Sequence, residues 1–332
     1  MSQPAIIGIE GTAHTCGVGI VTLCDEVEIL ANQKKTFTPV TGGIHPREAA
    51  YHITENLPFL LRSAFEEANI DQKNVCAVSF SQGPGLGPCL RATATGARAL
   101  SLALKKPLIG VNHPLAHIEM GMQLEKLQDP LTLYVSGGNT QLTAYSNHRY
   151  HVFGETQDIA IGNMIDTVAR AIGYDYALAG PIVEKEAHLG NKLINLPYSV
   201  KGMALSYSGF ATAAIRAFEE YHEKTTDICY SLQEIGFAML AEITEKSLIV
   251  SGRKELLLTG GVAANQRLRD MLQIIAEENN CSFSVVDRAL AGDNGVMIAV
   301  TGKKYFQKNQ FTALKDSNVI PKWRIDEVYV PW

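Results

Sequence analysis

Apolar residues along the chain are grouped in short runs separated by small polar turns. Residues 5–9 form one run, a polar turn follows, and a second run, CGVGIVTL, begins at Cys16. The same order of run, turn and run returns at 131–145 as LTLYV, SGGNT and QLTAY. Runs of this length bounded by Gly, Asn and Ser are typical of strands. The chain therefore looks duplicated in its elements, although not in its letters.

Longer amphipathic segments separate these strand pairs. A helix-like segment, HPREAAYHITENLPFLLRSAFEEANI, covers 45–70. A strand then enters a Gly-rich loop and a helix over 76–104, and a second strand, glycine loop and helix covers 255–278, with the helix expected to begin near Ala263. Strands that alternate with helices, with Gly loops at the strand ends, predict an α/β architecture.

The length of 332 residues favours two domains or one bilobed body. We expect a first lobe over 1–125 and a second over 126–332, because polar residues and Pro130 interrupt the pattern in 122–130. The last helix, near 293–310, is expected to pack back on the first lobe. Two similar lobes would form a cleft between them in which a ligand binds.

Composition narrows the class of protein. Hydrophobic content is 46% and charged content 19%, which is enough for an ordinary core. The net charge is −5 and the basic pairs are scattered, so RNA contact would require a local patch or a partner that supplies positive charge. Six cysteines without a CxxC motif predict reduced thiols. With no signal peptide and no run of about 18 apolar residues, we expect a soluble, cytoplasmic protein without a membrane partner.

The stretch LIGVNHPLAHIEMG, 108–121, places His113 and His117 four residues apart after an apolar run. Asn112 is a good N-cap, and Pro114 suits the first turn of a helix. A helix that begins there puts both imidazoles near one face, one turn apart. That spacing suits two ligands of one metal ion. Two half-buried histidines, each satisfied by backbone, are the alternative that the short pattern leaves open.

Glycine turns follow several of the predicted strands. YVSGGNTQ, 134–141, can bring backbone amides close to a phosphate, although a plain hairpin turn fits equally well. Gly260 and Gly261 can admit a base or ribose, or can serve tight strand–helix packing. A third Gly/Pro loop, within 81–100, is better explained as a rigid corner. None of these is a GxGxxG or Walker A motif.

Carboxylates within apolar patterns are the remaining candidates. Asp166 lies among apolar residues of a predicted helix and therefore needs a partner. Asp293 stands at the start of an apolar helix, where an N-cap role is as plausible as a functional one. Glu184 is weaker, because a solvated helix face explains it.

Taken together, these stretches resemble the universal tRNA threonylcarbamoyladenosine transferase family, once described as an O-sialoglycoprotein endopeptidase-like glycoprotease. The GIHPREAA wording is similar to its archaeal and eukaryotic branch, the catalytic subunit of the KEOPS complex. The resemblance implies the actin-like ATPase fold, with two RNase H-like lobes around a central cleft. The motifs that carry it, in order, are GIEGTAHT, GGIHPREAAYH, SFSQGPGLGPCLR, GVNHPLAHIE, YVSGGNTQ, GETQDIAIGNMID, LSYSG, LTGGVAANQRLR and DNGVMIA.

The resemblance also implies residue roles. One divalent metal, iron in the first instance and zinc as the alternative, would be held by His113, His117, Tyr134 and Asp293. The nucleotide-like substrate would be bound by Tyr134, Val135, Ser136, Gly137, Gly138, Asp166, Gly180, Glu184 and Asn265. Glu10 is expected to lie on the phosphate side. No general base is identified. This chain departs from the family's Pro-Gly-Gly-Pro-Lys run at Ala179 and Ile182, so Gly180 and Glu184 rest on the least complete match.

The activity implied is transfer of threonylcarbamoyl from L-threonylcarbamoyl-AMP to N6 of adenosine 37 in tRNAs that read codons beginning with A. ATP or its analogues would fit the same site. The implied partners are tRNA and the other KEOPS subunits, namely an atypical kinase-like ATPase, a small dimerising subunit and a further small subunit. Apolar helix positions within 55–65 are a docking surface compatible with the small dimerising subunit, although core packing explains them equally well.

Three other readings make different predictions. A metalloprotease requires HExxH, but Pro114 follows His113, and Glu119 comes two residues after His117. A sugar-kinase-like or chaperone-like ATPase of the same fold has no need of the histidine pair. For a non-catalytic RNA-binding or scaffold subunit, the acidic net charge argues against strong RNA binding by this chain alone, but not against such a role within a complex.

Overall fold

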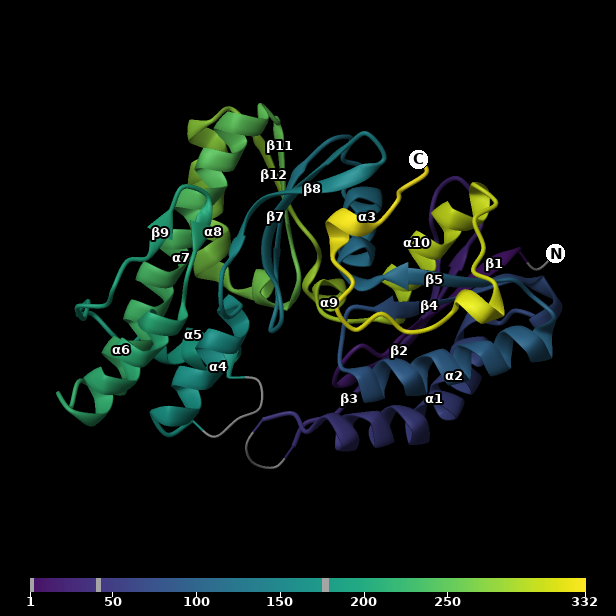
Figure 1. Ribbon diagram of the computed structural model, residues 1–332, viewed down its shortest axis with the longest axis horizontal. Helices are drawn as coiled ribbons and strands as arrows, with labels where there is room; N and C mark the ends of the chain where they lie inside the picture. The colour runs from purple at the N-terminus through teal and green to yellow at the C-terminus, as the bar shows by residue number, and fades with distance from the viewer. Residues whose placement is uncertain (1–2, 40–42, 175–178) are drawn as a thin grey trace.

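The computed structural model describes residues 3–39, 43–174 and 179–332, which are built around two sheets (Figure 1). The first sheet has the order β3-β2-β1-β4-β5. Its strands are β1 (Ala5–Glu10), β2 (Thr15–Thr22), β3 (Ile29–Thr36), β4 (Val75–Gly83) and β5 (Leu108–Asn112). The second sheet has the order β12-β11-β6-β7-β8-β10-β9. Its strands are β6 (Leu131–Val135), β7 (Thr140–Ser146), β8 (Arg149–Thr156), β9 (Val200–Lys201), β10 (Ala204–Leu205), β11 (Glu255–Thr259) and β12 (Ser282–Val285).

The duplication expected from the sequence is visible in the pairing of these strands. β1 and β2 are antiparallel neighbours, as are β6 and β7. β4 then pairs in parallel with β1, as β11 does with β6. The α/β class predicted from alternating strands and helices is confirmed.

Helices cover both faces of the first sheet, with α1 and α2 on one side and α10 on the other (Figure 1). The helices along the chain are α1 (Pro46–Ala68), α2 (Gly87–Leu104), α3 (His113–Leu124), α4 (Ile161–Ala171), α5 (Gly180–Ala187), α6 (Ser208–Glu219), α7 (Thr225–Ser251), α8 (Gln266–Glu278), α9 (Arg288–Ala291) and α10 (Gly295–Gln307). Short 3-10 turns lie at Gln72–Asn74, Gly261–Ala264, Leu314–Asp316 and Ile325–Glu327. Among the residues described, no helix is long and apolar enough to cross a membrane, and all six cysteines are free thiols.

Glycines in β1 and β2 let α10 approach the first sheet closely. A Cβ at Gly8 would lie 2.2 Å from the Ala299 nitrogen, and one at Gly19 would lie 2.3 Å from the Val296 nitrogen. No side chain fits at that separation, so the two backbones are in direct contact. The last long helix therefore packs on strands from the start of the chain.

Two helix starts differ from the prediction. α8 begins at Gln266, after a 3-10 turn, whereas the sequence pattern predicted a start near Ala263. The reason is that the Asn265 side chain accepts a hydrogen bond from the Leu268 amide at 3.2 Å and caps the helix there. α10 begins at Gly295, and its N-cap is Asn294. The capping alternative for Asp293 is therefore wrong.

The segment after α10 runs back along the first sheet and then reaches the second. Its backbone bonds to β5, where the Thr312 amide donates to the Leu108 carbonyl at 2.8 Å. It then bonds to the Gly/Pro loop within 81–100, where the Ile320 amide donates to the Gln82 carbonyl at 2.9 Å. It ends beside the β7–β8 turn, where the Val330 amide donates to the His148 carbonyl at 2.9 Å. These bonds connect the two sheets.

Candidate metal centre

The two histidines lie at the start of α3, as the sequence predicted. Asn112 caps the helix, because its side chain accepts a hydrogen bond from the Leu115 amide at 3.1 Å. The His113 and His117 rings are 4.9 Å apart and nearly perpendicular, and both side chains are buried. Within the described residues neither ring bonds to backbone, so the alternative of two backbone-satisfied histidines is not what the structure has.

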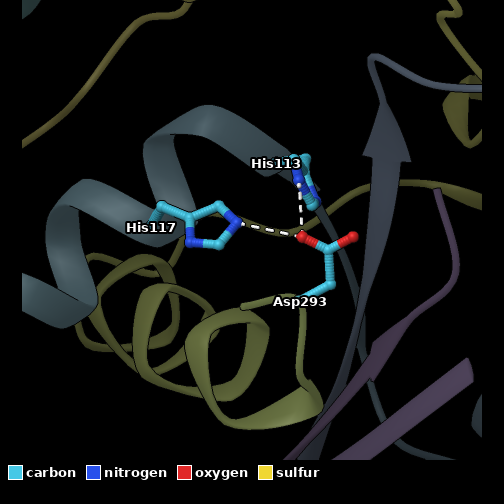
Figure 2. A group of neighbouring side chains, drawn as sticks. All are labelled: His113, His117 and Asp293. Carbon is cyan, nitrogen blue, oxygen red and sulfur yellow. Dashed lines mark hydrogen bonds and ion pairs between the residues drawn. The ribbon is translucent and has the colours of Figure 1, made fainter. Parts of the chain in front are cut away.

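Asp293 meets both histidines from the loop between α9 and α10 (Figure 2). Its Oδ1 lies 3.3 Å from Nε2 of His117 and 3.5 Å from Nε2 of His113. One donor atom from each of the three residues falls within a group whose members all lie within 4.8 Å of one another. Two imidazoles and a carboxylate at this separation are a donor set suited to iron or zinc.

Tyr134 stands beside this group at the end of β6. Its ring lies 5.0 Å from that of His117, and the residue is 1% exposed. Its hydroxyl makes no hydrogen bond of ordinary length and angle within the described part of the chain, although Ser136 and Asn139 lie close enough to lower its pKa. The two histidines and Asp293 fit a metal ion, and the buried hydroxyl of Tyr134 lies beside them.

Charge in this group is unevenly divided. Burial opposes the charged form of His113, but Glu10 and Asp293 outweigh it and raise the pKa of His113 to about 9. The pKa of His117 is lowered, mainly by burial and further by the charge of His113. Burial would raise the pKa of the Asp293 carboxyl, but the charge of His113 and the bond from His117 hold it well below its usual range. Burial raises the pKa of Tyr134, so its phenol is neutral unless a cation binds.

Glu10 is oriented toward His113. Its Oε2 lies 3.0 Å from Nδ1 of His113, while its Oε1 accepts hydrogen bonds from the amide and hydroxyl of Thr12, both at 2.7 Å. The carboxylate is completely buried. It was expected on the phosphate side, but both of its oxygens are taken by the chain's own donors. A proton on Nδ1 of His113 suits this contact, and Nε2 then faces Asp293.

The glycine turn after β6 is a hairpin turn, and its role as a phosphate site stays a prediction. The turn is closed by the Ser136 amide on the Asn139 carbonyl at 2.8 Å and by the Asn139 amide on Oγ of Ser136 at 3.0 Å. The amides of Gly137 and Gly138 donate to no residue that the structure describes. A Cβ at Gly162, in the first turn of α4, would lie 2.9 Å from the Gly137 nitrogen, so a helix N-terminus adjoins the two free amides. This is a suitable environment for an anion.

The other expected substrate residues form a second group around α5. Asp166 accepts a hydrogen bond from the Ala179 amide at 2.7 Å, which fixes the start of α5 at Gly180. Glu184 accepts one from the Gln266 amide at 2.7 Å. The substituted positions of this loop differ in their surroundings. Ala179 is fully buried in the core, whereas Ile182 is half-buried. Residues 176–178 of the same stretch lie outside the described residues.

Asn265 belongs to the same group but its side chain is already engaged. Its oxygen caps α8, and its Nδ2 donates to Oε1 of Gln233 at 2.6 Å. Val135 ends β6 and is buried, and its carbonyl lies where a Cβ at Gly260 would fall, 2.2 Å away. Gly260 also has φ of +98°, so the packing explanation for this glycine holds. The substrate roles of these residues stay predictions.

His14 connects the two groups and was missed in the sequence. It lies in the β1–β2 turn, and its Nδ1 is buried without a partner among the described residues. Burial raises the pKa of Asp166, and the Ala179 amide, Arg170 and His14 oppose that rise. His14 also helps to lower the pKa of Asp293, so it lies within electrostatic reach of both carboxylates. One indication of this role is present in the sequence, because His14 stands in the polar turn GTAHT that follows the first strand.

Comparisons with known proteins identify the family of the chain. A sequence model of the family described as tRNA N6-adenosine threonylcarbamoyltransferase matches residues 27–300. The chain is 50% identical over 326 residues to the protein of that name from Thermococcus sibiricus, which covers 98% of this chain and 99% of the relative. It is also 50% identical to a Methanocaldococcus jannaschii protein named "Probable bifunctional tRNA threonylcarbamoyladenosine biosynthesis protein". There the match covers 98% of this chain but only 60% of the relative's length.

Solved structures show the fold by a separate route. The crystal structure of HypF from T. kodakarensis superposes with a TM-score of 0.60 at 16% identity, over 92% of this chain and 48% of that one. A likeness at so low a sequence identity supports a shared fold but no shared function. The actin-like ATPase fold expected from the sequence is confirmed.

Proposed function

The chain belongs to the tRNA N6-adenosine threonylcarbamoyltransferase family, and from this premise we propose that it is a metal-dependent transferase acting on L-threonylcarbamoyl-AMP. The acceptor is N6 of adenosine 37 in tRNAs that read codons beginning with A. The observation that carries the proposal is the meeting of His113, His117 and Asp293 beside the buried hydroxyl of Tyr134.

The reaction is acyl transfer from a mixed anhydride. The exocyclic amine of adenosine attacks the carbamoyl carbon, and a carbon–nitrogen bond forms. The bond from that carbon to the phosphate oxygen breaks, AMP leaves with the electron pair, and the amine loses one proton. No redox step is involved. An exocyclic adenine nitrogen is a weak nucleophile, so holding the two reactants in register supplies much of the rate.

Four side chains of this chain would hold one divalent metal, iron or zinc: His113, His117, Tyr134 and Asp293. When bound, the ion supplies a Lewis acid that polarises the reacting group and offsets phosphate charge. Glu10 contributes by keeping the His113 proton on Nδ1, which leaves the lone pair of Nε2 available.

The glycine turn would bind the phosphate. The free amides of Gly137 and Gly138 are donors for the charge that develops on the leaving phosphate, and the adjoining N-terminus of α4 has the matching sign. Asp166, Gly180, Glu184 and Asn265 would bind the rest of the nucleotide. ATP or its analogues would fit the same place. We assign no general base.

We further propose that the chain works as the catalytic subunit of KEOPS. Its net charge of −5 favours tRNA binding together with partners that supply positive charge. The longer Methanocaldococcus jannaschii relative is named as bifunctional, which fits a close association with a second activity. Phe59 on α1 is 67% exposed and offers an apolar contact to the small dimerising subunit.

The decisive experiment is transfer of labelled threonylcarbamoyl from its AMP anhydride to unmodified tRNA. The chain would be tested with and without the KEOPS partners, before and after metal removal by a chelator. We expect label on adenosine 37 that depends on metal and partners. A rival ATPase would hydrolyse ATP with the His113→Ala variant as well as with the unaltered chain, and would transfer no label. Metal-independent ATP hydrolysis without label transfer would therefore refute the proposal.

A further inference from the structure

A second buried carboxylate on α3 lies outside the site described above. Glu119 is 1% exposed and comes two residues after His117. Two residues on a helix are separated by about 200° around its axis. Glu119 therefore points away from the metal-site face of the same helix, and no role in the transfer reaction has been given to it.

Three donors from three different elements converge on this carboxylate. The hydroxyl of Tyr150, on β8, donates to Oε1 at 2.8 Å. Nε1 of Trp332, in the C-terminal segment, donates to the same oxygen at 3.3 Å. Nζ of Lys304, on α10, forms an ion pair with Oε2. Lys304 also lies 5.5 Å from the centre of the Trp332 ring, so the donors contact one another as well.

Of these elements, α3 carries two proposed metal ligands and α10 follows the loop that holds a third. α3 begins with His113 and His117, and α10 follows directly after Asp293. β8 pairs with β7, which pairs with β6, the strand that ends near Tyr134. Glu119 thus joins α3 to α10 and to β8, a strand of the same sheet as β6, and lies on the opposite side of α3 from the ligands.

The geometry points to Glu119 as a positioning residue for the metal site; the inference rests on the function proposed above. We propose that it acts through α3 on His113 and His117, and through Lys304 and α10 on Asp293. Ligand atoms must be held to within a few tenths of an ångström for tight metal binding. A carboxylate with three donors resists sliding of α3 against α10 better than apolar contact does, because each hydrogen bond has a preferred direction and length.

The test uses Co²⁺ as the probe, because its visible spectrum reports ligand geometry without any turnover. Its affinity would be measured by chelator competition for the full chain and for the Glu119→Gln variant, which keeps the shape and removes the charge. We expect Co²⁺ affinity to fall by about tenfold, with a changed spectrum, since supporting partners of ligands typically contribute at least that much. Tyr150→Phe, which removes one hydroxyl, should shift both readouts in the same direction by less.

A matched control is available in the second sheet's helices. Glu234 on α7 forms a two-bond ion pair with Arg267 on α8, at 2.6 and 2.7 Å, between helices that carry no proposed metal ligand. Glu234→Gln should leave Co²⁺ affinity and spectrum unchanged.

The outcomes separate the two proposals. If the unaltered chain binds no divalent ion, the metal-dependent function is wrong and this inference falls with it. If the unaltered chain binds Co²⁺, but Glu119→Gln lowers only the melting temperature and leaves affinity and spectrum intact, Glu119 is a purely structural residue and the inference alone is overturned. If Glu119→Gln does not fold, Tyr150→Phe decides by the same two readouts.

Discussion

Replacing Glu10 by Gln should change both the pH dependence of stability and the affinity for metal. Glu10 is the largest source of the raised His113 pKa, about 9 against an ordinary value of 6.5. In the metal-free protein the folded state therefore holds a proton on His113 between these two values, while the unfolded chain does not. Stability from this group is complete below pH 6.5 and is lost as the pH rises through about 9.

The magnitude follows from the size of the shift. Each pKa unit corresponds to 1.36 kcal/mol, so a shift from 6.5 to about 9 amounts to about 3 kcal/mol. Asp293 supplies part of the shift and remains in the variant, so Glu10→Gln should remove the larger share rather than the whole. His117 does not interfere, because its lowered pKa confines its own contribution to the range below pH 6.5.

The assay is urea unfolding of the chelator-treated protein at several pH values between 7 and 10, alongside NMR titration of the His113 ring. Stability of the unaltered chain should fall over this range by more than that of Glu10→Gln. The amide of Gln would also donate to Nδ1, which moves the His113 proton to Nε2 and should weaken metal binding. A His113 ring that titrates near 6.5 without metal, or equal slopes for the two proteins, would refute this reasoning.

Further expectations concern the ligands, the glycine turns and the isolated chain. The double variant His113→Ala/His117→Ala should lose bound metal by elemental analysis while its far-UV circular dichroism is retained; full occupancy would contradict the ligand assignment. Gly137→Ala should weaken binding of an AMP-containing substrate analogue by about tenfold, because the added methyl group keeps the phosphate away from the backbone amide. The melting temperature should stay unchanged, because nothing lies within 4 Å of the Cβ position. Gly209→Ala, in equally open space on α6, is its control. Gly260→Ala should destabilise the fold by about 1–3 kcal/mol in chemical denaturation, given its φ of +98°. Without its partners the chain should bind tRNA weakly, and tight, strongly salt-dependent binding by it alone would contradict the charge argument.

The parts of the fold with strong local patterns were predictable. Fully buried strands such as β1 and β6 are continuous apolar runs, and the helices beside them have clear periodicity. β3 and β8 were not predicted. Their sequences, ILANQKKT and RYHVFGET, mix polar residues with apolar ones because much of each strand is only half-buried or exposed. Pairing with a neighbouring strand, rather than local composition, determines their conformation.

The candidate site likewise has features that the sequence predicts and features that it does not. The start of α3 at His113 was predictable, because Asn112 and Pro114 are local signals. The approach of Asp293 and Tyr134 was not contained in any spacing, and the expectation came from the resemblance to a family. The contact between Glu10 and His113 joins positions 103 residues apart, so nothing near either residue announced it.

Glu119 shows what a sequence can signal without identifying a partner. Apart from the two histidines, it is the one polar residue in the stretch of α3 from His113 to Gly121, and every residue of that stretch is buried. A carboxylate in such a position must have donors, because burial of an unpaired charge costs more than a helix of this size can offset. The pattern therefore requires partners, but it does not say that they come from 31, 185 and 213 residues further along the chain. That Lys304 lies on the helix that follows Asp293 is a consequence of the packing of α10 against α3, which no local pattern contains.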